Sequence, residues 1–445
     1  MSTPRRHLFT AMLLVAASVG SAATAQLLPS IGQAVGGLGN LPVVGGVLGG
    51  PRGQGGAGAL STSSPGVLRT LDTVAVEGLA GLDPASLLDL RRLRLRELVR
   101  ENGRSLEMDN DGNPVRRGEL VAVDPDDASL NAARGAGFTV VRDARSGELG
   151  LRMTILAPPR KMGTREGLKR LRQAAPGIDA DYNHLFEPAG GGLAVAAGAA
   201  LAGGTGAGRA RIAMIDGAVA AHPSLAGASI EQKGFAGNPA PTGHGTAVAS
   251  LIVGDHGPFH GAARGASLIV ADVYGGNRAA GSAETVVRAL SWAAAKRPSV
   301  INISLVGPSN RLLARAIEVV ERRGIAIVAA VGNDGPAAPP QYPASYPGVI
   351  AVTAVDARDR ALTEAGKAAH LDFAAPGADL AAALPGRGYA RVRGTSFAAP
   401  LVSARLALSG SAAGLAAEAA PGRGRVGRGI ICRACRIDPR LVGAK

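Results

Sequence analysis

Residues 211–216, RIAMID, form a short apolar run that ends in an aspartate. The run shows no alternation of polar and apolar residues, which predicts a strand that is buried on both faces. Such strands occur in parallel sheets covered by helices, and the groups that follow them gather at one edge of the sheet. The run therefore predicts an α/β fold and makes Asp216 a candidate functional residue.

Further apolar runs without alternation follow along the chain, and segments with a helical pattern lie between them. This succession predicts a mostly parallel sheet with helices on both faces. We expect strands within 267–275, 299–307, 325–333 and 349–355, and helices within 244–254, 282–296 and 310–323. In such a fold, ligands bind at the carboxyl ends of the strands.

Polar residues stand near several of these carboxyl ends. Asp216 follows the first run, Asn333 lies in the stretch VGNDG, and His244 lies at the start of the first expected helix. Each has an ordinary structural interpretation, because Asp and Asn are common turn residues and a histidine near a helix start is usually structural. None of the three identifies a site by itself.

A serine stands at the front of another apolar segment, RGTSFAAPLVSARLALSG at 393–410. The segment predicts a buried helix with Pro400 in its first turns, where a missing amide costs least. Ser396 then has two interpretations. It caps the helix, or it is a nucleophile at a helix N-terminus, where free N–H groups and a partial positive charge stabilise an oxyanion.

Five motifs in a fixed order bear on this choice. Asp, His and Ser follow one another in the chain order of subtilisins, and the residues around them resemble the motifs of the subtilisin-like serine proteases, the subtilase family. The matching stretches are IAMIDGAVAAHPSL (212–225), GHGTAVAS (243–250), INISLVG (301–307), AAVGNDG (329–335) and GTSFAAP (394–400). The resemblance covers about residues 209–410.

The resemblance implies a role for each matching residue. Ser396 would be the nucleophile, His244 would take and return its proton, and Asp216 would orient the imidazole. Asn333 and the backbone N–H of Ser396 would form the oxyanion hole.

The resemblance also implies a substrate-binding region. Gln341 would lie near the floor of the pocket for the residue before the scissile bond, where family members often keep glycine. An added substrate strand would pair with an edge made of Ser304, Leu305, Val306 and Gly307. No acidic cluster suggests a metal site, so no cofactor is identified and calcium is allowed by the resemblance alone. The chain departs from the family pattern at Gly217-Ala218, Ala247 and Ala399, and none of these changes removes a catalytic atom.

Residues 1–25 have the features of an export signal: a basic start, an apolar stretch and the small-residue site Ala23-Thr24-Ala25. We therefore expect an exported protein, secreted or periplasmic, with no stable membrane span after signal removal. An uncleaved anchor is the alternative, although the apolar stretch is short for a membrane span. Residues 26–83 read as a Gly-rich, low-complexity linker.

Residues 84–186 predict a helical segment and a small domain. The segment 84–104 alternates leucines with arginines, as in a helix that packs its leucine face on a neighbour or binds a membrane. Residues 118–186 have the order β-α-β-β-α-β of a ferredoxin-like α+β fold, which resembles by pattern the inhibitory propeptide of subtilases. A Gly/Ala-rich linker at 187–208 offers a place for cleavage.

The protease domain is expected over 209–430 and a basic tail over 431–445. The net formal charge is +14, but the tail has no aromatic residues of the kind that nucleic-acid binding uses, so a solvated basic surface is favoured. Cys432 and Cys435 lack further zinc ligands and a thioredoxin-like context, which favours a local disulfide.

These observations together predict an exported subtilisin-like serine endopeptidase that is made as a zymogen and hydrolyses peptide bonds through an acyl-enzyme. Its partners would be polypeptide substrates and its own N-terminal propeptide, an intramolecular inhibitor, with no nucleic acid. The alternative is a non-catalytic binding or sensor protein on a protease fold. The presence of all four chemically required side chains favours the enzyme.

Overall fold

The computed structural model describes residues 81–189, 210–386 and 388–444. The expected export signal, most of the linker 26–83 and nearly all of the linker 187–208 lie outside the described residues. Among the helices that are described, none combines the length and the apolar character that a membrane crossing requires.

The described chain begins with helix α5, Pro84–Glu101. Asp83 caps the helix by accepting hydrogen bonds from the backbone N–H groups of Ala85 and Ser86. The interpretation as a helix that packs its leucine face on a neighbour is confirmed, because Leu87, Leu95 and Leu98 are buried.

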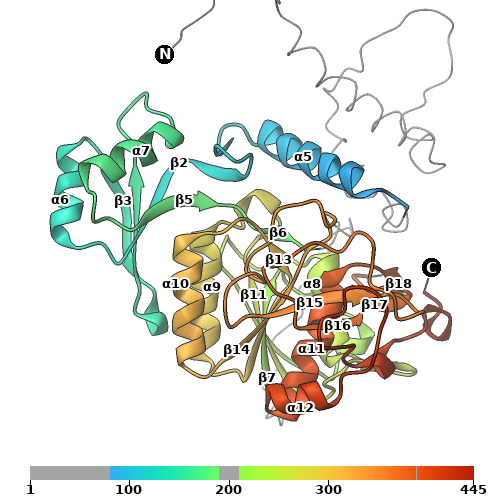
Figure 1. The fold of residues 1–445 in the computed structure, drawn as a ribbon. Coiled ribbons are helices and arrows are strands. Elements are labelled where there is room, and N and C mark those ends of the chain that lie inside the picture. The colour runs from blue at the N-terminus through green and yellow to red at the C-terminus, as the bar shows by residue number, and fades with distance from the viewer. Residues whose placement is uncertain (1–80, 190–209, 387, 445) are drawn as a thin grey trace, which may run out of the picture. The chain divides into compact units, whose positions relative to one another are not determined.

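A five-stranded antiparallel sheet with two helices follows α5 (Figure 1). Its elements include the predicted order β-α-β-β-α-β, and the four strands of that set lie in the order β5-β2-β4-β3, as in ferredoxin-like folds. The elements are β1 (Leu106–Met108), β2 (Pro114–Val123), α6 (Asp127–Gly135), β3 (Thr139–Arg145), β4 (Arg152–Ala157), α7 (Thr164–Ala174) and β5 (Ala180–His184).

The second sheet has seven strands, all parallel, in the order β16-β15-β14-β12-β7-β11-β8. The predicted mostly parallel sheet is confirmed. Its strands are β7 (Arg211–Asp216), β8 (Ser229–Gly234), β11 (Ser267–Asp272), β12 (Val300–Ile303), β14 (Ala326–Ala330), β15 (Ile350–Val355) and β16 (Phe373–Pro376).

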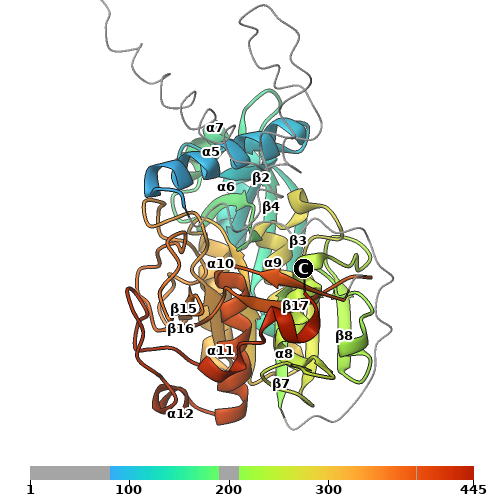
Figure 2. The same cartoon turned by 90° about the vertical axis from the view of Figure 1, so that its right-hand side faces the viewer.

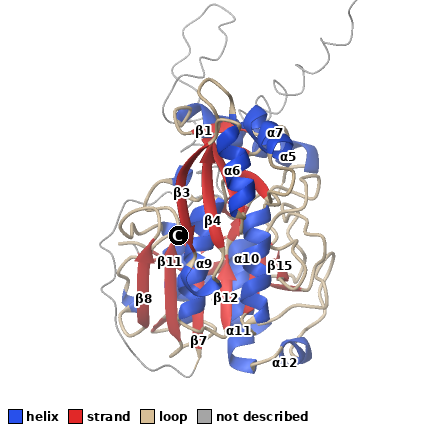
Figure 3. Ribbon diagram, turned by 90° about the vertical axis from the view of Figure 1, so that its left-hand side faces the viewer, coloured by secondary structure: helices blue, strands red, loops and turns tan. Residues whose placement is uncertain are grey.

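Helices cover both faces of this sheet, as Figures 1 and 3 show. The side chains of β7 explain the two layers, because Ala213 and Ile215 join the core with α9 and α10, whereas Ile212 and Met214 join the core with α8 and α11. The helices are α8 (Gly243–Val253), α9 (Ala283–Ala295), α10 (Arg311–Arg322) and α11 (Thr395–Ser409).

The N-terminal sheet packs against α9 and α10 (Figure 2). Val121 of β2 and Met153 and Ile155 of β4 are buried in the same core as Leu290 of α9. At the margin of this contact the guanidinium of Arg142 donates two hydrogen bonds to the carboxylate of Glu284. The sheet that precedes the linker is thus held on the larger sheet's helices by apolar and charged contacts together.

Several elements of the larger domain are not predicted by the sequence. The strand β8 lies at the edge of the sheet with several exposed positions, so it lacks the buried apolar run of its neighbours. Other elements without a prediction include strand β16, the short helix α12 (Ala412–Ala417) and the antiparallel hairpin of β17 (Leu380–Leu384) and β18 (Gly388–Val392).

The expected separate tail also differs from the structure. Ile431, Cys432 and Ile437 are buried in the core of the larger domain, and the backbone N–H of Ala381 donates to the carbonyl of Ile437. Residues 431–444 therefore belong to that domain, because a few apolar side chains anchor a segment whose composition is otherwise basic. The expected local disulfide Cys432–Cys435 is present.

Candidate active site

Asp216 and His244 are joined by a hydrogen bond at the carboxyl end of the large sheet. Asp216 is the last residue of β7, and His244 lies in the first turn of α8. Asp216 Oδ1 accepts a hydrogen bond from His244 Nδ1 at 2.9 Å, and the two side chains are 1% and 4% exposed. Because Nδ1 faces the carboxylate, a neutral imidazole has its lone pair on Nε2, which has no hydrogen-bond partner among the described residues.

Gly217, one of the departures from the family pattern, lies so close to Thr242 that a larger residue would collide with it. A Cβ atom on Gly217 would lie 2.4 Å from Thr242 Oγ1. Thr242 caps α8 through the same hydroxyl, which accepts from the backbone N–H of Gly245. The turn after Asp216 therefore packs closely on the helix start that carries His244.

Ser396 lies in the first turn of α11, and its capping interpretation is wrong. The N-cap residue is Gly394, no side chain caps the helix, and Ser396 Oγ is buried without a hydrogen-bond partner among the described residues. The next side chain, Phe397, packs against His244 with 5.4 Å between ring centroids. The start of α11 and the start of α8 therefore meet.

Asn333 follows β14 and is fixed against the start of α11. Its Oδ1 accepts a hydrogen bond from the backbone N–H of Thr395 at 2.9 Å. Gly394 allows the close approach, since it has φ +138° and an added Cβ would lie 2.8 Å from Asn333 Nδ2. The Nδ2 group therefore lies beside Gly394, two residues before Ser396.

A segment of the chain itself, residues 187–189, lies against β13 and Asn333, and the place that it fills is called the groove below. The short strand β6 (Glu187–Pro188) pairs antiparallel with β13 (Leu305–Val306). The next residue, Ala189, donates its backbone N–H to the carbonyl of Ser304 at 2.8 Å. Asn333 Nδ2 donates a hydrogen bond to the carbonyl oxygen of Ala189. Residues 304–306 of the predicted edge therefore pair with an extended segment of the same chain, whereas the backbone of Gly307 pairs with Tyr342.

The remaining predicted substrate-binding residues flank this segment. Gly307 lies under Phe186, because an added Cβ would lie 2.6 Å from the Phe186 ring. Gln341 is buried. Its Cγ is 3.4 Å from the place that a Cβ on Gly332, the residue before Asn333, would take. Gln341 therefore borders the chain that carries Asn333, and its Nε2 donates to the carbonyl of Pro339.

Two arginines of α5 contact this part of the molecule. Arg91 and Arg94 form ion pairs with Asp334, at 3.2 and 3.0 Å, and Arg94 also pairs with Glu187 at 3.5 Å. A Cβ on Gly335 would lie 2.8 Å from the Leu87 side chain. Helix α5 thus lies against the residues that follow Asn333 and against the segment in the groove.

A buried hydrogen-bond chain behind Ser396 is not predicted by the sequence. Ser403 Oγ donates to Asn302 Oδ1, Asn302 Nδ2 donates to Ser304 Oγ, and Ser304 Oγ donates to the carbonyl of Ser396, each at 3.0 Å. These bonds link β12 and Ser304, the residue between β12 and β13, to the first and third turns of α11. Asn302 and Ser403 lie inside apolar runs, and their polar character there is the signal that could have identified them.

Two buried groups beside Asp216 have raised pKa values. Burial raises the pKa of Asp272, which lies opposite Asp216 in the parallel pair β11–β7, while three backbone N–H bonds act in the other direction. Burial also raises the pKa of Tyr274 well above its usual value, and the charge of Asp216 adds to this effect. Tyr274 therefore stays protonated and donates to the carbonyl of Phe186 at 3.2 Å.

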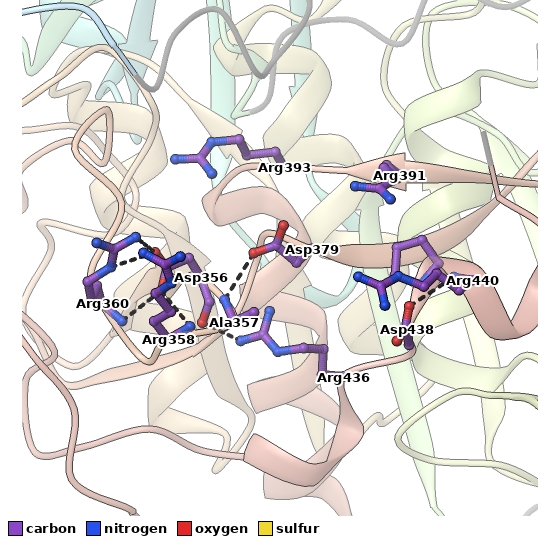
Figure 4. A pocket seen from close by; sticks show the side chains of 11 residues that line it. Asp356, Ala357, Arg358, Arg360, Asp379, Arg391, Arg393, Arg436, Asp438 and Arg440 are labelled. Atoms are coloured by element: carbon purple, nitrogen blue, oxygen red, sulfur yellow. Dashed lines mark hydrogen bonds and ion pairs between the residues drawn. The ribbon is translucent and has the colours of Figure 1, made fainter.

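A separate pocket of about 540 Å³ contains none of the predicted site residues (Figure 4). It is lined by six arginines and three aspartates that partly neutralise one another, as in the pair of Arg360 with Asp356. In the described ranges no three or more His, Cys, Asp or Glu side chains form a group that could hold a metal ion.

The fold is that of subtilisin-related proteins. Fervidolysin from Fervidobacterium pennivorans, a keratinolytic enzyme related to subtilisin, matches with a TM-score of 0.59 at 18% identity. The match covers 76% of this chain and 63% of that one. This share of the chain is larger than the part that the sequence motifs cover, so the likeness of fold extends beyond them.

Sequence comparison then identifies the family. The model of the subtilase family matches residues 210–419. The chain is 34% identical over 215 residues to the major intracellular serine protease of Bacillus subtilis (strain 168), which is 44% of this chain and 67% of that protein. It is also 34% identical over 207 residues to subtilisin Savinase of Lederbergia lenta, and this match covers 44% of this chain and 75% of that protein. The chain belongs to the subtilase family of serine proteases.

Proposed function

We propose that this protein is an exported endopeptidase that uses Asp216, His244 and Ser396 as its catalytic triad and is made as a zymogen. One observation carries the proposal: Asn333 Nδ2 donates to the carbonyl oxygen of Ala189, in a segment bound along β13 as an extended strand. A bond from Asn333 to a peptide carbonyl is what an oxyanion-hole donor would make, and it supports Ala189 as the residue whose carbonyl is attacked.

In the proposed acylation, Ser396 Oγ attacks the substrate carbonyl carbon and His244 Nε2 takes the hydroxyl proton. The carbonyl oxygen becomes an oxyanion, which accepts hydrogen bonds from Asn333 Nδ2 and the backbone N–H of Ser396. The C–N bond then breaks, and the amine leaves with the proton from His244. Asp216 keeps the imidazole oriented and stabilises its charged form through the 2.9 Å bond.

Deacylation repeats these steps with water as the nucleophile. His244 Nε2 takes a proton from the water, whose oxygen attacks the ester carbonyl of the acylated Ser396. The second tetrahedral intermediate uses the same two donors. Its collapse releases the carboxylic acid product, and His244 returns the proton to Ser396 Oγ.

The zymogen part of the proposal rests on residues 84–189. These residues supply the segment in the groove, the sheet packed on α9 and α10, and helix α5, whose arginines pair with Asp334. With Ala189 opposite Asn333, the proposed self-cleavage lies between Ala189 and Gly190. Export rests on the sequence of residues 1–25 alone.

Two alternatives remain to be tested against this proposal. Residues 84–189 could form a permanent accessory domain, and the whole chain could be a non-catalytic binding or sensor protein on a protease fold. The unoccupied hydrogen-bonding capacity of His244 Nε2 and Ser396 Oγ supports the catalytic proposal, because buried polar atoms are otherwise nearly always satisfied.

Mass spectrometry of the purified full chain and of Ser396→Ala tests the proposal. We expect the parent to yield a polypeptide that begins at Gly190 and reacts with a fluorophosphonate probe, and Ser396→Ala to do neither. A fully active form still joined to residues 84–189 would support the accessory domain. A parent that neither hydrolyses casein nor reacts with the probe would support the non-catalytic alternative.

A further inference from the structure

Glu187 is a buried carboxylate in the groove, and two arginines from opposite sides contact it. Its side chain is 7% exposed, and it lies opposite Val306 in the β6–β13 pair. Arg94 of α5 lies 3.5 Å from one carboxylate oxygen, and Arg278 lies 3.6 Å from the other.

The two arginines differ in their place in the chain. Arg94 precedes the proposed cleavage at Ala189 and would leave with the N-terminal region. Arg278 belongs to the protease domain, in the turn that also supplies the carbonyl of Gly281 to the backbone N–H of Phe186. Arg278 therefore stays at the wall of the groove that faces β13.

We propose that Arg278 is a specificity-determining residue, which selects substrates with an acidic side chain two residues before the one whose carbonyl is attacked. Counted from Ala189, this is the third residue before the scissile bond, the place of Glu187. The inference rests on the proposed function, because it takes residues 187–189 as a substrate-like segment. The substrate class is thus a polypeptide with Glu or Asp at that position.

Charge gives the physical reason. A substrate carboxylate at the position of Glu187 gains the guanidinium of Arg278, which is 30% exposed. Asp334 opposes this preference once Arg91 and Arg94 have left, because Arg94 contacts both carboxylates and they therefore lie near one another. Arg278 contacts the carboxylate of Glu187 directly, so we expect its attraction to exceed this repulsion. Partly exposed ion pairs give modest effects, so we expect a preference of roughly three- to fivefold in kcat/KM.

Three peptide p-nitroanilides test the proposal with the self-processed full-length protein. They have the sequence Phe-Xaa-Pro-Ala, which copies residues 186–189, with Glu, Gln or Lys as Xaa. We expect the order Glu, Gln, Lys in kcat/KM. Arg278→Ala should bring the Glu and Gln peptides to the same value, and Arg278→Glu should reverse the order. Arg358→Ala removes an arginine that lines the separate pocket of Figure 4 and should keep the parent's order.

Each failure has its own meaning. If the parent hydrolyses none of the peptides and no protein substrate, the proposed function is wrong. If the parent hydrolyses the Glu and Gln peptides equally well, or if Arg278→Glu keeps the parent's order, the protein remains a protease and the role of Arg278 is overturned.

Discussion

The side-chain amide of Asn333 donates a hydrogen bond to the carbonyl oxygen of Ala189. The other end of the same amide accepts from the backbone N–H of Thr395 at 2.9 Å, next to Ser396. One side chain therefore connects the segment in the groove with the start of the helix that carries the proposed nucleophile. This double attachment makes Asn333 the residue whose replacement best separates a catalytic role from a structural one.

Asn333→Ala and Asn333→Asp should both lower kcat by about 100- to 1000-fold with little change in KM, a range known from the subtilisins of this family. Both variants lose the Nδ2 donor, but Asn333→Asp keeps an oxygen that can accept from Thr395. Steady-state kinetics and thermal unfolding of the same samples provide the measurement. Normal kcat in Asn333→Asp, with a lowered melting temperature only in Asn333→Ala, would indicate a turn residue instead.

Ser396→Ala and His244→Ala should each abolish peptide hydrolysis, and the double variant should be no worse than either. The members of a triad act as a unit, so their losses do not add. Casein hydrolysis and circular dichroism report activity and folding. Ser299→Ala, which changes an exposed serine on the loop before β12, is the matched control. Activity within tenfold of the parent in either variant would contradict the triad.

The sequence predicts the large sheet and the placement of Asp216 and Asn333 well. Asp216 ends a strand that is buried on both faces, and Asn333 comes shortly after another. The resemblance to subtilases also predicts the bond partner of His244, Asp216. The helical pattern alone leaves Ser396 open between cap and nucleophile, because either role uses the same helix position, and the resemblance of the five ordered motifs favours the nucleophile. Only the conformation of Gly394 and the lack of a partner for Ser396 Oγ exclude the cap.

Other parts of the site have no signal in the sequence. Strand β6 contains only Glu187 and Pro188, and two residues are too few to show a strand pattern. The contact of α5 with Asp334 joins residues about 240 positions apart, and neither the arginines nor the aspartate differ from ordinary surface charges. Such contacts depend on tertiary packing, which a local pattern does not contain.

Helix α5 should hold the protease in its inactive form through Arg91 and Arg94. Their ion pairs with Asp334 are largely buried, with 10% and 23% of the arginine side chains exposed. Breaking buried pairs leaves a carboxylate without compensation, which is costly. In the full-length double variant Arg91→Ala/Arg94→Ala we expect proteolytic activity to appear roughly tenfold sooner after refolding.

The control for this prediction is Arg92→Ala/Arg96→Ala, which removes the same charge from the exposed side of the same helix. A time course of peptide hydrolysis after dilution from denaturant gives the comparison. Equal lag times in the two double variants would mean that α5 acts only through the packing of Leu87 and its neighbours.

Acidification should destabilise the protease domain through His222. Its side chain is buried, with Nε2 donating to the carbonyl of Gly388 and Nδ1 accepting from the backbone N–H of Ser224. Burial lowers the pKa of His222 below its usual 6.5, although the bond to Gly388 acts in the other direction. Because the folded pKa lies below the unfolded one, the stabilisation is present above about pH 6.5 and is lost as the pH falls through the folded value.

The measurement is the melting temperature between pH 8 and pH 5, in the Ser396→Ala background to prevent self-digestion. We expect the melting temperature to fall more steeply below pH 6.5. A protonated Nδ1 can no longer accept the hydrogen bond from the Ser224 N–H. His222→Gln should melt lower at pH 8 but depend less on pH, because glutamine does not titrate. If the melting temperatures of both proteins fall in parallel, another group governs the acid response and the assignment to His222 is wrong.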